Sequence, residues 1–370
     1  MTQTPAPTPK LDLSVSGLKE TARELFSHPP TMFVVLLEAI PALYFMLYGF
    51  GAVGGLVMIG TLAMMLFTIL AGMGFGFINA PIFATFMGLT CLSAGRPWLA
   101  GVVACGLGLW AAFGWGSGKG SLVTPSVSIL TIQLLVPTQI ISGRHPDDWV
   151  NVGAVFGIAL AAALWGVVLG GIQRRGRKIP HLPPAGWRWN VTLGALMGLV
   201  MGITAGVATA YNTGQGGAWL LMTVFLVFRP LDQNPWTRSL HRVVGTAIGA
   251  LIVVGFLETI PSQTPTIALM LPAVFFLVAA AQAIMGGKWP YWSFVSLLTP
   301  GIVLLVACLS STSGTVKVAQ GLTGVRLEYT LLAIAIALGS QLVLIGMAHL
   351  FKLKERAWFQ EMVAAHPTPS

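Results

Sequence analysis

Long apolar segments, bounded by glycine, proline and charged residues, recur along almost the whole chain. We place them near residues 32–50, 52–72, 74–92, 98–115, 122–142, 151–172, 190–210, 217–230, 241–258, 266–286, 290–311 and 327–351. Most approach the length of roughly 20 residues that a helix needs to cross a bilayer. Only 8% of the 370 residues are charged, whereas soluble domains contain about 25%. The sequence therefore predicts an all-α polytopic membrane helix bundle of about 12 transmembrane helices.

A basic polar segment divides these apolar windows into two halves of six. We expect a cytoplasmic N-terminal tail with a possible amphipathic helix, a first transmembrane half, a basic cytoplasmic linker, a second transmembrane half and a cytoplasmic C-terminal tail. These parts cover residues 1–30, 31–172, 173–188, 189–351 and 352–370. The two-half arrangement is the simplest organisation that places all the apolar windows.

The basic residues are distributed unevenly between the two sides of this arrangement. If both termini are cytoplasmic, only Arg96, Arg144, Lys317 and Arg326 of the 20 Lys and Arg residues fall on the outside. Cytoplasmic loops of membrane proteins collect Lys and Arg, so the bias predicts an even number of spans with both ends inside. We interpret the net charge of +9 as this topology signal. No nucleic-acid partner is expected.

Glycines spaced four residues apart predict helix faces that pack closely. They are Gly194, Gly198, Gly202 and Gly206 in the seventh window, Gly245 and Gly249 in the ninth, and Gly153 and Gly157 in the sixth. In a bilayer, small residues at this spacing let two backbones approach each other. We expect tight helix packing, and a homodimer is the usual arrangement for such a bundle.

Several cationic and polar residues lie around the eighth and ninth windows and form a candidate substrate pathway. They are Trp219, Thr223, Arg229, Arg238, His241 and Arg242. Guanidinium groups stay charged at physiological pH and donate paired hydrogen bonds to carboxylates. These arginines could therefore form a positive mouth for an anion, or they could extend to the cytoplasmic membrane surface and only fix the helices there. For Trp219, an interfacial aromatic belt is the simpler explanation.

Arg326 is expected to open the last window on the outer side, where the charge bias does not favour a cation. It needs an anionic partner, and the candidates are Glu258 and a carboxylate substrate. Lys317, on the same side, is expected in an exposed loop.

Glu38 lies inside the first apolar window, about 9 Å beyond Met32 along a helix axis. Loss of hydration favours the protonated form of a carboxylate, so Glu38 is the candidate proton-coupling residue. The alternative is a Glu near the helix start that pairs with Lys19 or Arg23.

A set of motifs in the second half resembles a known family. Trp219 and Thr223 precede Val-Phe-Arg-Pro at 227–230, Arg238 and Arg242 precede Gly245-Thr246, and Arg326 leads to Thr330. In order and spacing, residues 187–350 resemble the fusaric acid resistance protein-like family of the aromatic acid exporter superfamily. The resemblance implies a six-helix repeat in the bacterial inner membrane. It also implies export of aromatic or other organic acids, often driven by protons and sometimes with a periplasmic adaptor protein.

The leading hypothesis is therefore a secondary transporter that exports hydrophobic organic anions. Arg229, Arg238 and Arg242 would attract the carboxylate on the cytoplasmic side, and Arg326 would act on the exit side. An organic-anion channel would use the same arginines without proton coupling. A non-transporting membrane scaffold would explain the glycines but would leave Arg326 unexplained.

We do not expect an enzyme or a bound cofactor. His145, Asp147 and Asp148 form a polar cluster within a single loop, and the three cysteines lie far apart without the spacing of a metal site. The sequence also has no GxxxxGK[ST] segment, so direct coupling to ATP is not expected.

Overall fold

The computed structural model describes residues 37, 40–45, 47–114, 120–174, 187–228, 235–261, 266–285, 290–310 and 315–350. The helices are α3 (Gly51–Ala71), α4 (Met73–Leu92), α5 (Pro97–Gly114), α6 (Gly120–Leu135), α7 (Trp149–Arg174), α8 (Trp187–Ala210), α9 (Gly214–Val227), α10 (Pro235–Glu258), α11 (Thr266–Met285), α12 (Tyr291–Ser310) and α13 (Thr315–Leu350). This part of the chain contains no strand. An all-helical fold is therefore confirmed for it.

Six of these helices are long and apolar enough to cross a membrane. The spans are Gly51–Ile69, Met73–Leu92, Trp149–Arg174, Trp236–Glu258, Tyr291–Cys308 and Val318–Val343, and there are shorter apolar helices at Pro97–Ala112, Ser126–Leu135, Gly194–Ala210 and Gly214–Val227. These spans make the chain a multi-pass membrane protein. The total of 12 spans stays a prediction.

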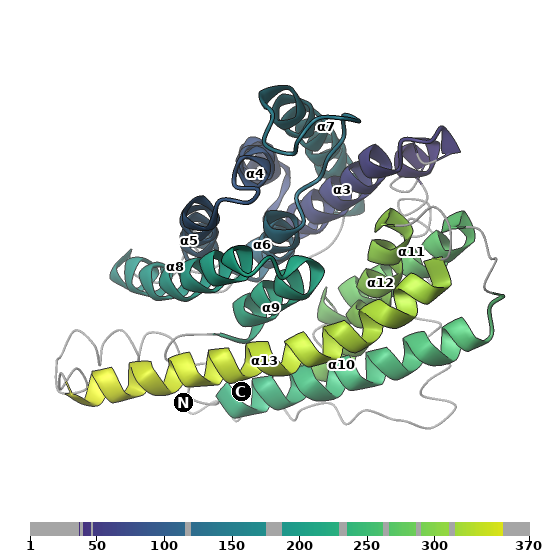
Figure 1. Cartoon of the computed structure of the whole chain (residues 1–370). Helices are drawn as coiled ribbons and strands as arrows, with labels where there is room; N and C mark the ends of the chain where they lie inside the picture. The colour runs from purple at the N-terminus through teal and green to yellow at the C-terminus, as the bar shows by residue number, and fades with distance from the viewer. Residues whose placement is uncertain are drawn as a thin grey trace, which may run out of the picture.

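The helices form two groups that meet at α9 (Figure 1). In the first group, α3 and α4 pack on α7, and α5 packs on both α6 and α8. In the second group, α12 packs between α10 and α11, while α13 runs beside α10. Since α9 contacts α6 and α8 on one side and α10 and α13 on the other, it joins the two groups.

Four of the helix contacts within the first half have counterparts, in the same order, within the second half. The pairs α3–α7, α4–α7, α4–α6 and α5–α6 correspond to α9–α13, α10–α13, α10–α12 and α11–α12. Such a correspondence is expected if both halves are built from one helical unit. The boundary at 173–188 falls mainly outside the described residues and stays a prediction.

The last helix begins about three turns earlier than its apolar window predicts. Residues 315–326 contain polar side chains and two glycines, which weaken the hydropathy signal, yet Val316, Ala319 and Thr323 lie buried along one face of α13. Two expectations are therefore wrong. Lys317 lies in the first turn of a helix and not in a loop, and Arg326 lies within the helix and not at its entrance.

The four-glycine face of α8 lies directly against α5. A Cβ atom on Gly198 would lie 2.9 Å from the Cys105 carbonyl oxygen, and one on Gly202 would lie 3.0 Å from the Gly101 oxygen. Gly194 and Gly206 extend the same contact toward Leu109 and the Pro97 carbonyl oxygen at the two ends. Backbone therefore meets backbone along most of this interface.

Gly245 and Gly249 of α10 make a similar contact with α12. A Cβ atom on Gly249 would lie 2.8 Å from the Ser296 carbonyl oxygen. In contrast, Gly153 and Gly157 of α7 face open space, and the close contacts of α7 with α3 are made by Gly166 and Gly170.

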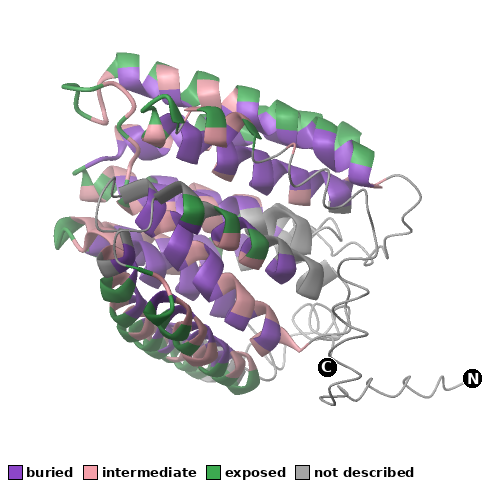
Figure 2. Ribbon diagram, turned by 90° about the vertical axis from the view of Figure 1, so that its right-hand side faces the viewer, coloured by how far each residue is buried: buried purple, intermediate pink, exposed green. Residues whose placement is uncertain are grey.

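Exposed residues follow the outer faces of the outer helices, as Figure 2 shows.

Candidate functional site

Helix α9 is enclosed by protein on every side. All its residues from Gly216 to Val227 are buried. With 14 residues it is about 21 Å long, which is shorter than the hydrocarbon core of about 30 Å. Asn212, in the turn before it, and Gly214, its first residue, both have positive φ. Short helices that are buried in protein at membrane depth are typical of the substrate paths of transporters.

Trp219 and Thr223 share one face of α9, since they are four residues apart. Both side chains are buried, and neither the indole Nε1 nor the threonine Oγ1 has a hydrogen-bond partner within the described residues. The sequence favoured an interfacial aromatic belt for Trp219, and this interpretation is wrong because the residue lies inside the protein. Trp236, by contrast, is exposed, as a belt residue should be.

Arg242 faces the interior from the second turn of α10. Its side chain is 0% exposed, and Thr246, one turn further along the same face, is buried beside Gly245 and Gly249. An arginine that extends to the membrane surface would keep its guanidinium group in water. That interpretation is therefore wrong for Arg242. Its three nitrogens have no hydrogen-bond partner in the described part of the chain.

Arg326 reaches the same interior from α13 and is 1% exposed. Its guanidinium carbon lies 5.3 Å from the centroid of the Trp219 ring, which is within the range of a cation–π interaction. Glu258, the acidic partner considered from the sequence, is exposed and forms no ion pair with it. Among the described residues the three nitrogens of Arg326 also lack a hydrogen-bond partner.

The two buried arginines lie close enough to repel each other electrostatically. The sequence placed Arg242 on the cytoplasmic side and Arg326 on the exit side, and this separation is wrong. Helices α10 and α13 pack side by side, and the early start of α13 places Arg326 within this packed region. With no anionic partner in the described part of the chain, two such buried cations cost several kcal/mol each unless an anion joins them.

Arg238 has a different environment from Arg242, although both are on α10. Its Nε donates a 3.0 Å hydrogen bond to the carbonyl oxygen of Leu226 in the last turn of α9, and its guanidinium carbon lies 4.9 Å from the Tyr291 ring centroid. A cation at a helix C-terminus is favourable because the carbonyl groups there carry partial negative charge. Arg238 therefore stabilises the end of α9.

The remaining predicted site residues do not add to the buried pair. His241 is half-buried on α10. Arg229 and Glu38 lie outside the described residues. The hydroxyl of Thr246 was missed as a site group, and it lies buried without a hydrogen-bond partner in the described structure; that of Thr299, next to Gly249, is buried and unpartnered there too. Thr246 could have been found from its place in the Arg-x-x-Gly-Thr motif, whereas nothing around Thr299 distinguished it.

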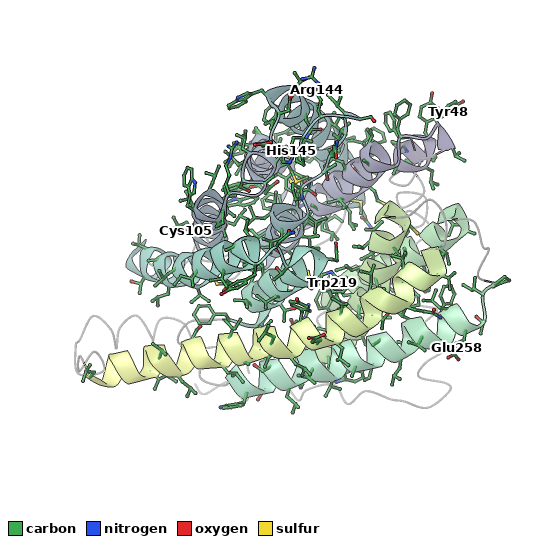
Figure 3. The ribbon with its side chains drawn as sticks, viewed as in Figure 1. Tyr48, Cys105, Arg144, His145, Trp219 and Glu258 are labelled. Atoms are coloured by element: carbon green, nitrogen blue, oxygen red, sulfur yellow. The ribbon has the colours of Figure 1, made fainter. Side chains whose placement is uncertain are left out.

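A second polar cluster, far from Trp219, joins two loops at the surface (Figure 3). Arg96 pairs with Asp147 at 2.6 Å, His145 approaches the same carboxylate at 2.6 Å, and Arg144 pairs with Asp148 at 2.9 Å. The contact with His145 is the main cause that lowers the pKa of Asp147. For Asp148 the main cause of its lowered pKa is the backbone N–H of Val150. The described residues contain no cluster suited to a metal ion.

The part of the chain that holds both buried arginines matches a known family. The model of the fusaric acid resistance protein-like family matches residues 203–339. The resemblance inferred from the sequence is thus confirmed over this region, which runs from within α8 into α13. Neither the curated proteins nor the solved structures contain a match.

Proposed function

Since residues 203–339 match a family of membrane efflux and resistance transporters, we propose that this chain is a bacterial inner-membrane secondary transporter. It exports aromatic or other hydrophobic organic acids. The observation that carries the proposal is the burial of Arg242 and Arg326, which lie together inside the protein without an anionic partner among the described residues.

The chemistry of the site suits a carboxylate attached to an apolar body. Each guanidinium group can donate two parallel hydrogen bonds to a carboxylate. The face of Trp219 next to Arg326, together with the buried Phe225 and Phe228, offers apolar surface for the rest of such a molecule. Thr223 and Thr246 supply additional hydroxyl donors.

Glu38 is the proposed site of proton coupling. A carboxylate within an apolar segment takes up a proton more readily than one in water. Exchange of this proton with the outside would let the proton gradient drive export of the anion. We place both termini in the cytoplasm, and a homodimer and a periplasmic adaptor protein remain predictions.

Transport into inverted membrane vesicles tests the proposal. We expect Arg242→Met and Arg326→Met each to reduce uptake of an aromatic acid at least tenfold. Arg144→Met, an exposed arginine bound to Asp148, is the matched control and should transport like the wild type. Normal transport by Arg242→Met at equal protein levels would overturn the proposed site.

Proton coupling and channel activity give different results in the same vesicles. For a proton-coupled exporter, uptake should stop when the pH gradient is collapsed, and Glu38→Gln should be insensitive to the gradient. For an organic-anion channel, current should persist in Glu38→Gln and vary linearly with voltage. No anion movement by either assay would favour the membrane scaffold.

A further inference from the structure

The groups around the two buried arginines form a set of hydrogen-bond donors. Arg242 and Arg326 contribute six nitrogens, Trp219 contributes its indole Nε1, and Thr223 and Thr246 contribute hydroxyl groups. None of these atoms has a hydrogen-bond partner among the described residues. Guanidinium and indole nitrogens can only donate. These donors would therefore be satisfied by a hydrogen-bond acceptor that several of them can share.

The charge around the site is also unbalanced. Two positive charges are buried, while every acidic residue in the described structure lies at or near the surface. These acids are Asp147, Asp148, Glu258 and Glu328. Buried charges in proteins are paired or neutralised, and an arginine cannot be neutralised by losing its proton. No acidic side chain of the described residues neutralises these two charges, and an anion from solution that both guanidinium groups share would lower the cost of burying them.

An exported substrate can balance this charge only while it is bound. After each release the same two guanidinium groups would face each other in a site that is largely sealed from water. We propose that a small inorganic anion, of the charge and size of chloride, occupies the site whenever the organic anion is absent. The displacement part of this proposal rests on the proposed function, whereas the binding of chloride does not.

A monovalent anion is favoured over a divalent one for two reasons. It loses less hydration free energy on burial, since the cost of removing an ion from water rises steeply with charge. Both guanidinium groups can share one such anion, and the site then keeps a net positive charge that attracts the carboxylate of an incoming substrate. Chloride and the organic acid should therefore compete for the site.

Thermal unfolding of the purified full-length protein tests whether chloride binds. Chloride should replace methanesulfonate at constant ionic strength, so that general screening is unchanged. A ligand that binds only the folded protein raises the melting temperature progressively with its concentration. We expect this rise for the wild type and for Arg144→Met. Arg242→Met and Arg326→Met should show less than a third of it.

Fluorescence of Trp219 gives a second measurement that does not depend on unfolding. Iodide, which quenches indole fluorescence on contact, should reach the site in place of chloride and quench a component that is missing in Trp219→Phe. Chloride added afterwards should restore this component. In Arg242→Met, which keeps Trp219, quenching should need at least tenfold more iodide.

The outcomes separate this inference from the proposed function. A melting temperature that does not depend on chloride, or that depends on it equally in the wild type and Arg242→Met, would overturn the inference. Transport in vesicles would still test the exporter. If chloride binds through both arginines but no organic acid is transported, the inference holds and the proposed substrate class is wrong.

Discussion

Gly108 of α5 lies against Gly198 of α8 so closely that a Cβ atom on Gly108 would come within 2.6 Å of the Gly198 backbone nitrogen. The neighbouring atoms are backbone, so a side chain at this position cannot be accommodated by a rotamer change. The two helices would have to move apart, and the contact extends along most of α8. This interface joins the first half of the chain to the second.

Gly108→Leu should therefore destabilise the protein by more than the 1–3 kcal/mol typical of overpacking, because it separates two helices along their length. Gly153→Leu is the matched control, since Gly153 faces open space. We expect a clearly lower melting temperature in detergent for Gly108→Leu and little change for Gly153→Leu. Equal stability of the two variants would contradict the observed packing of α5 on α8.

Asn151 uses its whole amide group to hold the loop before α7. Its Oδ1 accepts hydrogen bonds from the N–H groups of Ile140 (2.8 Å) and Ile141 (3.3 Å), and its Nδ2 donates to the carbonyl oxygens of Thr138 (3.2 Å) and Pro146 (2.9 Å). The side chain is fully buried. The loop 136–148 therefore depends on one residue for four of its backbone contacts.

Asn151→Leu should cost about 1–3 kcal/mol for each backbone group that it leaves buried without a partner. Asn79→Leu is the matched control, because Asn79 is also buried but its amide makes only a weak 3.8 Å contact with the sulfur of Met64. The free energies of unfolding of both variants, measured by denaturant titration, give the comparison. A smaller loss for Asn151→Leu than for Asn79→Leu would count against this role.

Arg242→Met should raise stability in a chloride-free medium, although we expect it to reduce transport at least tenfold. Burial of an ion without a counter-charge costs several kcal/mol, and an apolar side chain of similar length does not incur this cost. The removal also relieves the repulsion that Arg242 exerts on Arg326. Unfolding in methanesulfonate should show this gain. A destabilised Arg242→Met would mean that Arg242 has a protein partner beyond the described residues.

The contact between Asp147 and its neighbours should make a pH-dependent contribution to stability. The lowered pKa of Asp147 means that its ionised form is favoured in the folded state, relative to the ordinary value of 3.8. Its contribution is complete above that value and disappears as the pH falls through the folded-state pKa. The difference in melting temperature between the wild type and Asp147→Asn should therefore shrink as the pH falls below 4. A difference that grows on acidification would reverse the assigned sign.

Most of the helices could be predicted from apolar length alone, because a bilayer imposes similar dimensions on every span. The start of α13 could not be predicted in this way. The face formed by Val316, Ala319 and Thr323 is buried only by tertiary packing, and the polar residues beside this face weaken the hydropathy signal. The glycines of α5 that contact the α8 glycines could not be predicted either. Gly101 and Gly108 are seven residues apart, so a search for a four-residue spacing does not pair them with each other.

The types of residue in the site could be predicted, but not their arrangement. The motifs singled out Trp219, Thr223, Arg242 and Arg326 by chemistry, and the structure buries all four. The assignment of Arg242 and Arg326 to opposite sides of the membrane failed because a linear sequence of windows says nothing about how far along its neighbour a helix lies. Arg238, four residues before Arg242, differs from it only because the end of α9 lies within its reach.

The enclosure of α9 also has a consequence for how the chain is assembled during synthesis. A helix without a lipid-facing side gains little by leaving the insertion machinery on its own. When α9 emerges from the ribosome, α6 and α8 are already made, while α10 and α13 are not. Half of its surroundings are therefore missing at first, and the two arginines that complete them arrive on the helices that close over it.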